Sequence, residues 1–116
     1  MMEPLVVLVT ASSPEEAARL AQALVDERLA ACVNVVPGLR STYRWQGRVE
    51  TADETLLIVK TARHLLAATS ERVRALHSYS VPEIIALPIV GGSASYLEWL
   101  GGQVRPEAEV GEPAGD

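Results

Sequence analysis

The chain has 116 residues, of which 48% are hydrophobic, and a length of this order predicts one domain whose core contains no phenylalanine. The net charge of −5 argues against nucleic acid or an anionic membrane as the main partner, and no apolar run approaches the ~18 residues that cross a bilayer. The single cysteine excludes an internal disulfide, and without a signal-peptide pattern at the N-terminus we expect a cytoplasmic protein.

The N-terminal part of the chain predicts a strand and then a helix. Residues 5–10 form a short apolar run that is typical of a buried strand. Ser13, Pro14 and Glu16 follow as a helix N-cap, a proline at the first helical position and a capping-box glutamate. Leucine and alanine then recur at helical spacing, with charged residues on the opposite side, so we expect this helix to cover a sheet.

The segment 29–61 predicts one unusually long β-hairpin. Side chains alternate on both sides of residues 46–47, where glycine supplies the positive φ of a two-residue turn, and this register sets Tyr43 opposite Glu50. The proline and glycine at 37–38 predict a bend or bulge in the first strand of the hairpin.

The same hairpin predicts an assembly of several copies. Residues 56–59 are apolar on both faces, which indicates that helices cover one face and further protein covers the other. A long ribbon with unpaired edges promotes aggregation unless neighbouring chains pair with it. A three-fold ring of protomers satisfies each edge, so we expect a homotrimer.

The C-terminal half predicts a second helix, a fourth strand and a short final helix. The second helix carries an apolar stripe over 65–76, and the fourth strand, 84–89, is framed by prolines that suit an edge position. Ser93 is a candidate N-cap of the last helix, and the glycines at 101–102 are expected to end it. The predicted element order is βαββαβ plus this helix.

Several separated segments resemble the CutA family of divalent-cation tolerance proteins. The segments are LAACVNVVPGLRSTYRWQG, ETLLIVKT and SYSVPEIIALPI, followed by YLEWL. The resemblance implies an α+β class, a ferredoxin-like βαββαβ sandwich with an extended hairpin between the second and third strands. It also implies a tight homotrimer like that of the PII signalling proteins. We expect a CutA-like domain at 1–102 and an acidic, disordered tail at 103–116.

Three side chains are candidate ligands of a divalent metal ion, copper or zinc. Cys32 and His77 suit such an ion, and Glu54 adds a carboxylate at the start of a buried strand segment. Cys32 is also explained as a small buried side chain, and His77 as a cap on the end of the second helix.

The family resemblance bears on the metal site in two ways. It adds weight to His77, because CutA proteins carry a histidine there and some members show copper at nearby histidine and cysteine positions. This chain has Leu76 and Leu8 where copper-binding members can have a further histidine and cysteine. We therefore expect weak copper binding.

Aromatic side chains near strand ends predict either packing between protomers or a pocket between them. Glu54 and Lys60 share one strand face and are candidates to pair with another chain. The candidate lining residues of an inter-subunit cleft are Tyr43, Trp45, Lys60, Tyr79 and Glu83.

The sequence has no glycine-rich phosphate loop, no nucleophile elbow and no His-Glu-x-x-His motif, so we expect no enzyme. The expected function is CutA-like metal ion tolerance through weak copper binding. One alternative is a PII-like signalling or scaffold trimer that binds a small molecule or a protein in its inter-subunit clefts. Another is a thiol enzyme that uses Cys32 with His77, which requires an accessible thiol of low pKa.

Overall fold

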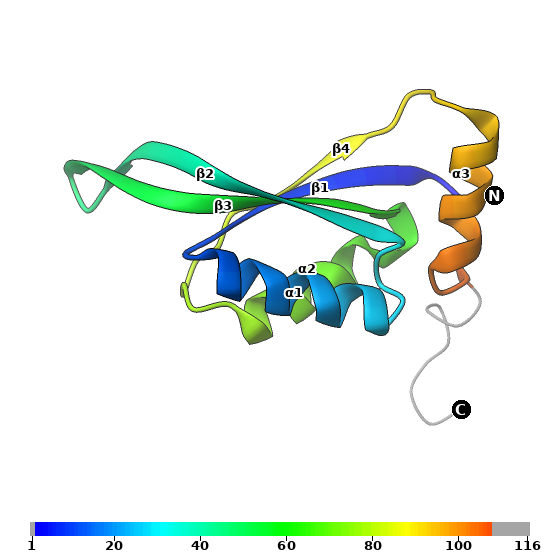
Figure 1. Ribbon diagram of the computed structural model, residues 1–116, viewed down its shortest axis with the longest axis horizontal. Helices are drawn as coiled ribbons and strands as arrows, with labels where there is room; N and C mark the ends of the chain where they lie inside the picture. Colours follow the sequence, from blue (N-terminus) through cyan, green and yellow to red (C-terminus); the bar gives the residue numbers. More distant parts are fainter. Residues whose placement is uncertain (1, 108–116) are drawn as a thin grey trace.

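The computed structural model describes residues 2–107 of the chain. Four antiparallel strands form one sheet in the order β2-β3-β1-β4, and two helices pack on one of its faces (Figure 1). The α+β class and the ferredoxin-like order of elements are as predicted. The elements are β1 (Pro4–Ala11), α1 (Pro14–Asp26), β2 (Cys32–Trp45), β3 (Arg48–Ala62), the short 3-10 helix η1 (Arg63–Leu65), α2 (Leu66–Leu76), β4 (Ile84–Pro88) and α3 (Ala94–Gln103).

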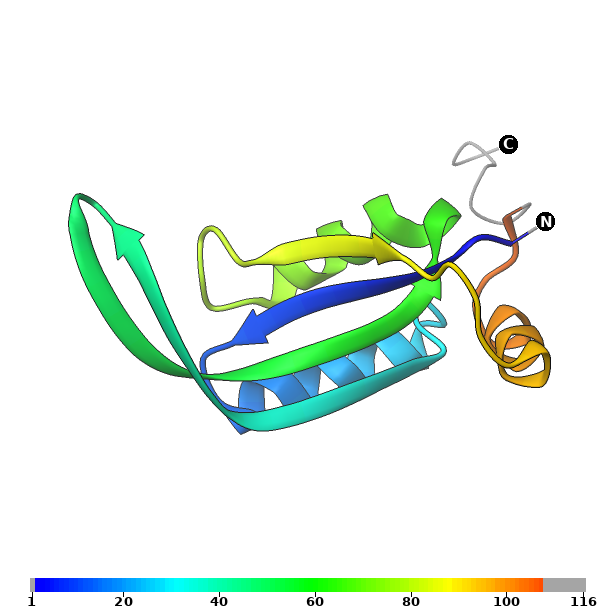
Figure 2. The ribbon, with the colours of Figure 1, turned by 90° about the horizontal axis from the view of Figure 1, so that it is seen from above.

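The hydrophobic core lies between the sheet and the helices α1 and α2. Every second residue of β1 faces this core, and Val7 and Val9 are fully buried. Leu57 and Val59 of β3 also face this core and are fully buried. The residues between these core-facing positions, in both strands, point to the other face and are only half-buried. Within residues 2–107 no helix runs along the opposite face of the sheet, and α3 stands at one end of it (Figure 2).

The β2-β3 hairpin extends well beyond the rest of the sheet (Figure 1). Gln46 and Gly47 have φ values of 51° and 81°, as a tight two-residue turn of this kind requires. The predicted register, with Tyr43 opposite Glu50, is confirmed.

The predicted bulge lies in β2 between Val36 and Leu39. Val36 pairs with Leu56, and Leu39 pairs with Glu54. Between these two pairs β2 advances by three residues and β3 by two, so β2 contains one extra residue. The extra residue exchanges the faces of the odd and even positions of β2. Beyond the bulge the odd positions of β2 therefore share the face of Glu54.

The C-terminus of the domain differs from its prediction. The glycines at 101–102 do not end α3, which continues to Gln103, because neither takes the positive φ with which a glycine ends a helix. Val104 is 2% exposed, and Arg105 donates from Nε to the carbonyl of Glu27 at 2.8 Å. The packed domain thus extends beyond residue 102, and the rest of the predicted tail, 108–116, lies outside the described residues.

Candidate functional site

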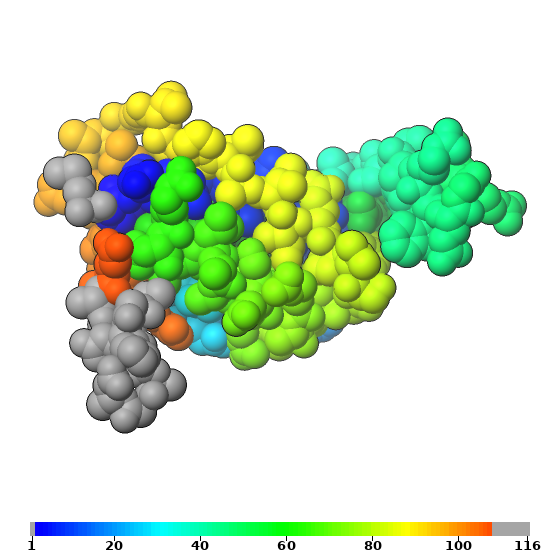
Figure 3. Space-filling view, turned by 180° about the vertical axis from the view of Figure 1, so that it is seen from behind, coloured from blue at the N-terminus to red at the C-terminus, as the bar shows by residue number. Residues whose placement is uncertain are grey.

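The loop between α2 and β4 meets the base of the hairpin at one end of the sheet. Figure 3 shows the hairpin standing out from the body beside this loop, with the surface hollowed between the two. Two different environments adjoin here. One is a buried polar network around His77, and the other is an open cleft.

The ring of His77 is buried and bonded to backbone on both sides. Its side chain is 0% exposed, its Nε2 lies 2.7 Å from the carbonyl oxygen of Thr10, and the backbone N–H of Tyr79 donates to Nδ1 at 3.0 Å. An Nδ1 that accepts carries no proton, so the ring is neutral and Nε2–H donates to Thr10. His77 is the C-cap residue of α2, as one prediction had it, and its backbone N–H donates to the carbonyl of Val73. Its ring, however, bonds to the end of β1 and not to the last turn of the helix.

Glu16 is the centre of this network, a role beyond the capping-box position that the sequence predicts for it. The Ser13 side chain does cap Glu16 N–H, as predicted. The Glu16 carboxylate, however, accepts from Ser12 N–H and Oγ–H, each at 2.9 Å, and from Ser78 N–H at 2.7 Å. Burial raises the pKa of Glu16, but the hydrogen bonds from Ser12 and Ser78 outweigh burial and lower the pKa from 4.5 to about 2.

Tyr79 joins the network to the cleft. Its ring lies against the ring of His77, with centroids 4.7 Å apart, and its hydroxyl donates to Oε2 of Glu54 at 2.8 Å. Burial, the hydrogen bond to Glu54 and the negative charge of that carboxylate together raise the pKa of Tyr79 to about 12. Tyr79 is therefore a neutral donor at physiological pH.

The cleft has a volume of about 550 Å³, within the usual range of small-molecule sites. Its walls come from the distal half of β2, from β3 and from the loop before β4. Three aromatic residues and two carboxylates are the groups in it that can recognise a ligand. The lining residues are Thr10, Ser41, Thr42, Tyr43, Trp45, Glu54, Tyr79, Ser80, Val81 and Glu83.

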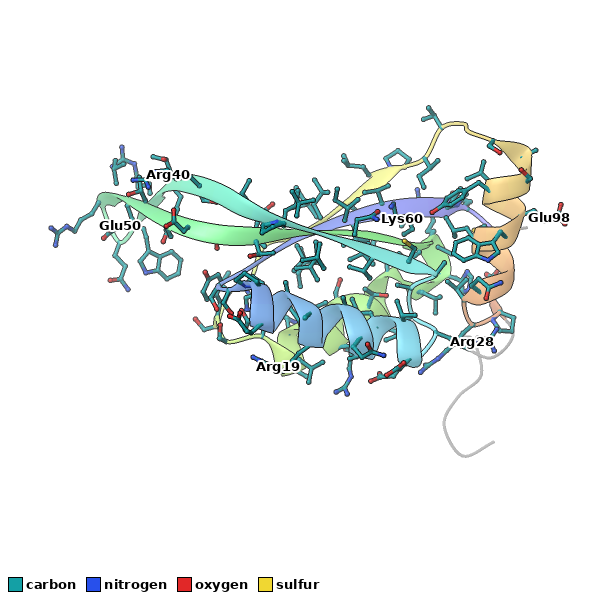
Figure 4. All side chains as sticks on the ribbon, viewed as in Figure 1. Arg19, Arg28, Arg40, Glu50, Lys60 and Glu98 are labelled. Atoms are coloured by element: carbon teal, nitrogen blue, oxygen red, sulfur yellow. The ribbon has the colours of Figure 1, made fainter. Side chains whose placement is uncertain are left out.

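The cleft contains four of the five predicted lining residues, and the predicted metal ligand Glu54 lies among them. Lys60 is the exception, because it lies six residues from Glu54 along β3, or ~20 Å in an extended strand. Its ammonium group instead donates to the side-chain oxygen of Asn34. In Figure 4 Lys60 lies toward α3, far from Arg40 and Glu50 near the tip of the hairpin.

The three predicted metal ligands do not converge within one chain. His77 and Glu54 both contact Tyr79, whereas Cys32 pairs with Lys60 at the other end of β3. Cys32 is half-buried beside Tyr96, whose pKa is raised by burial and by this thiol. Among residues 2–107 no three His, Cys, Asp or Glu side chains are grouped as a metal site. The residues of a single chain do not fit the metal centre that the sequence predicted.

Both the sequence and the fold of this chain are similar to those of known proteins. Residues 5–103 match the family model for the CutA1 divalent ion tolerance protein. The divalent-cation tolerance protein CutA of Thermus thermophilus is 60% identical over 95 residues, which cover 82% of this chain and 92% of that protein. The chloroplastic CutA of Arabidopsis thaliana is 52% identical over 101 residues, 87% of this chain but only 56% of the plant protein.

Solved structures give the same result. The Thermus thermophilus divalent cation tolerance protein superposes with a TM-score of 0.87 and 56% identity, over 88% of this chain and 99% of that chain. The periplasmic divalent cation tolerance protein CutA of Archaeoglobus fulgidus superposes with a TM-score of 0.85 and 40% identity, over 88% of this chain and 99% of that chain.

Proposed function

Because this chain belongs to the CutA1 divalent ion tolerance protein family, we propose that it is a homotrimer that serves divalent metal ion tolerance by binding rather than by catalysis. One observation carries the non-catalytic part of this proposal. Both ring nitrogens of His77 are bonded to backbone groups, so the histidine has no free lone pair or proton with which to act on a substrate. The same bonds argue against a thiol enzyme that uses His77.

The uncovered face of the sheet supports the trimer. Ile85 and Leu87 of β4 project from this face and are 50% and 49% exposed, and Val36 of β2 is 42% exposed. Both β2 and β4 are edge strands, so their outer hydrogen-bonding groups have no partner within the described sheet. Copies of the chain in a closed ring would bury these side chains and pair these edges.

Native mass spectrometry of Ile85→Glu tests the trimer. We expect a trimer for the wild type and a monomer for the variant, because the new charge would be buried between copies. Val25→Glu is the matched control, since Val25 is 40% exposed on the helix α1. A wild-type monomer, or loss of the trimer in both variants, contradicts this assignment.

For metal tolerance we propose weak binding of a divalent ion, with copper as the first ion to test, at Glu54 in the cleft. His77 joins such a site only if its ring releases a backbone bond, and Cys32 joins only from another copy. Titration of the full chain with Cu(II), followed by native mass spectrometry, should give partial loading that Glu54→Gln reduces. Glu50→Gln, an exposed carboxylate on the hairpin, is the control. Equal loading of the two variants contradicts the assignment of Glu54.

A second candidate function, binding of a small molecule as in PII-like proteins, is supported by the volume and the aromatic lining of the cleft. In a trimer this cleft would lie where the hairpin meets its neighbours. Tryptophan fluorescence of the wild type and of Trp45→Leu, recorded with metal ions and with metabolites, separates the two functions.

We also propose a cytoplasmic location, and cell fractionation tests it. Among residues 2–107 no helix is both long and apolar enough to cross a membrane. The chloroplastic plant relative and the periplasmic archaeal one make this test necessary.

A further inference from the structure

The chemical lining of the cleft is strongly biased in charge. It contains the carboxylates of Glu54 and Glu83, and among residues 2–107 no lysine, arginine or histidine side chain lines it. Glutamate carboxylates are ionised at neutral pH, and Tyr79 remains a neutral donor there. Arg48 lies opposite Trp45 on the same face but is not among the lining residues, so the lining itself is negative and disfavours phosphates and carboxylic acids as ligands.

Three aromatic side chains line the cleft, those of Tyr43, Trp45 and Tyr79. Tyr43 and Trp45 are two residues apart on one strand, so their side chains leave the same face of β2 ~7 Å apart. Tyr79 lines the same cleft from the loop before β4. A cation within ~6 Å of several ring faces is attracted by each of them.

The bulge in β2 is what brings these rings to the acidic wall. Without the extra residue between Val36 and Leu39, even positions of β2 would share the face of Glu54, and Tyr43 and Trp45 would face away from it. Tyr43 and Trp45 are 43% and 49% exposed, so their ring faces are accessible in the single chain.

We propose that the cleft binds an organic ammonium cation, with the ammonium head against Tyr43 and Trp45 and the carboxylates of Glu54 and Glu83 as its counter-charges. This inference rests on the small-molecule function proposed for the same cleft and names the chemical class of its ligand. A weakly hydrated ammonium group suits aromatic walls, because each ring face attracts it and the carboxylates beside the rings balance its charge.

The test compares choline with the neutral alcohol in which carbon replaces the choline nitrogen. The two have nearly the same shape and differ in charge. Saturation-transfer NMR and tryptophan fluorescence on the full wild-type chain, at constant ionic strength, should give choline about tenfold tighter binding than the alcohol. Trp45→Leu and Glu83→Gln should each weaken choline binding about fivefold or more, with the oligomeric state unchanged.

Matched controls lie on α3. Trp99 is 45% exposed, and Glu98 is an exposed carboxylate on the same helix, so Trp99→Leu and Glu98→Gln should leave choline binding unaltered. Equal affinity for choline and the alcohol overturns the ammonium inference while the small-molecule function stands. No binding of choline or the alcohol overturns the ammonium inference, while binding of another metabolite in the fluorescence screen would still support the small-molecule function.

Discussion

The polar network around His77 and the cleft beside it are built from similar residue types, yet they have opposite properties. In the network Glu16 accepts three hydrogen bonds and is 3% exposed, and both nitrogens of His77 are used. In the cleft Glu83 is exposed and the rings of Tyr43 and Trp45 are open to solvent. Saturation of the hydrogen-bonding groups, rather than residue type, separates a structural centre from a binding surface.

Tyr79 belongs to both regions. Its backbone fixes the tautomer of His77, and its hydroxyl orients Glu54 in the cleft wall. The network thus holds the loop that forms one wall of the cleft. We expect changes in the network to alter stability strongly, and changes in the cleft to alter ligand binding with little effect on stability.

The largest expected effect is that of Glu16→Ala. The variant removes a buried carboxylate and leaves the N–H groups of Ser12 and Ser78 without their acceptor, and we expect a loss of about 3 kcal/mol in the free energy of unfolding. Urea denaturation at one fixed protein concentration measures it. Glu15→Ala, an exposed position in the same helical turn, is the control, and equal losses in the two variants would remove the distinction between network and surface.

Acid should remove a similar amount of stability from the wild type. The pKa of Glu16 is lower in the folded chain than in the unfolded one, so its contribution is present above pH 4.5 and is lost as pH falls toward about 2. At ~1.4 kcal/mol for each pKa unit, this contribution is on the order of 3 kcal/mol. Glu16→Gln should show a correspondingly flatter dependence over this range, and an unchanged slope would contradict the lowered pKa.

His77→Ala should cost about 2 kcal/mol, because the Thr10 carbonyl and the Tyr79 N–H each lose a buried partner. Thermal and urea unfolding measure the loss. If the variant instead retained full stability and lost Cu(II) binding, His77 would be a metal ligand and not a structural residue, and the comparison of the two regions would fail.

Tyr79→Phe should have a smaller effect on stability, about 1 kcal/mol, because the hydroxyl gives up one hydrogen bond to Glu54. The pKa of Tyr79 adds a spectroscopic test. The ultraviolet titration of tyrosinate in the wild type should contain a component near pH 12 that the variant lacks. A difference spectrum that appears near the ordinary value of 10 would show that Glu54 does not accept this bond in solution.

The smallest expected effect is that of Arg40→Ala on the hairpin. Arg40 and Asp53 lie 3.5 Å apart, but their side chains are 69% and 87% exposed. Exposed ion pairs are screened by water and salt, so we expect no measurable change in stability. A clear loss in denaturation experiments would show that the hairpin is buried against another chain at this point.

Local sequence patterns predicted the elements of the fold well. The turn at Gln46-Gly47, the bulge after Val36 and the Ser13 cap were each visible in a few adjacent residues, and each is present. The predicted end of α3 was wrong, because the buried side chains of Leu100 and Val104 pack the last turn and neither glycine between them takes a positive φ. Lys60 lies outside the cleft of the single chain, about six strand residues from Glu54, and its place in a cleft between subunits stays a prediction.

The order of strands and helices and the hairpin register could be predicted from the sequence, because these depend on the periodicity and backbone preferences of near neighbours. The pairing of the polar groups could not, because it depends on residues that the fold brings together. Glu16 meets Ser78 across 62 residues, and His77 meets Thr10 across 67. Partners so distant along the chain are chosen by the packing of helices on the sheet, and that packing made His77 a structural residue and left the adjacent carboxylates and rings open to a ligand.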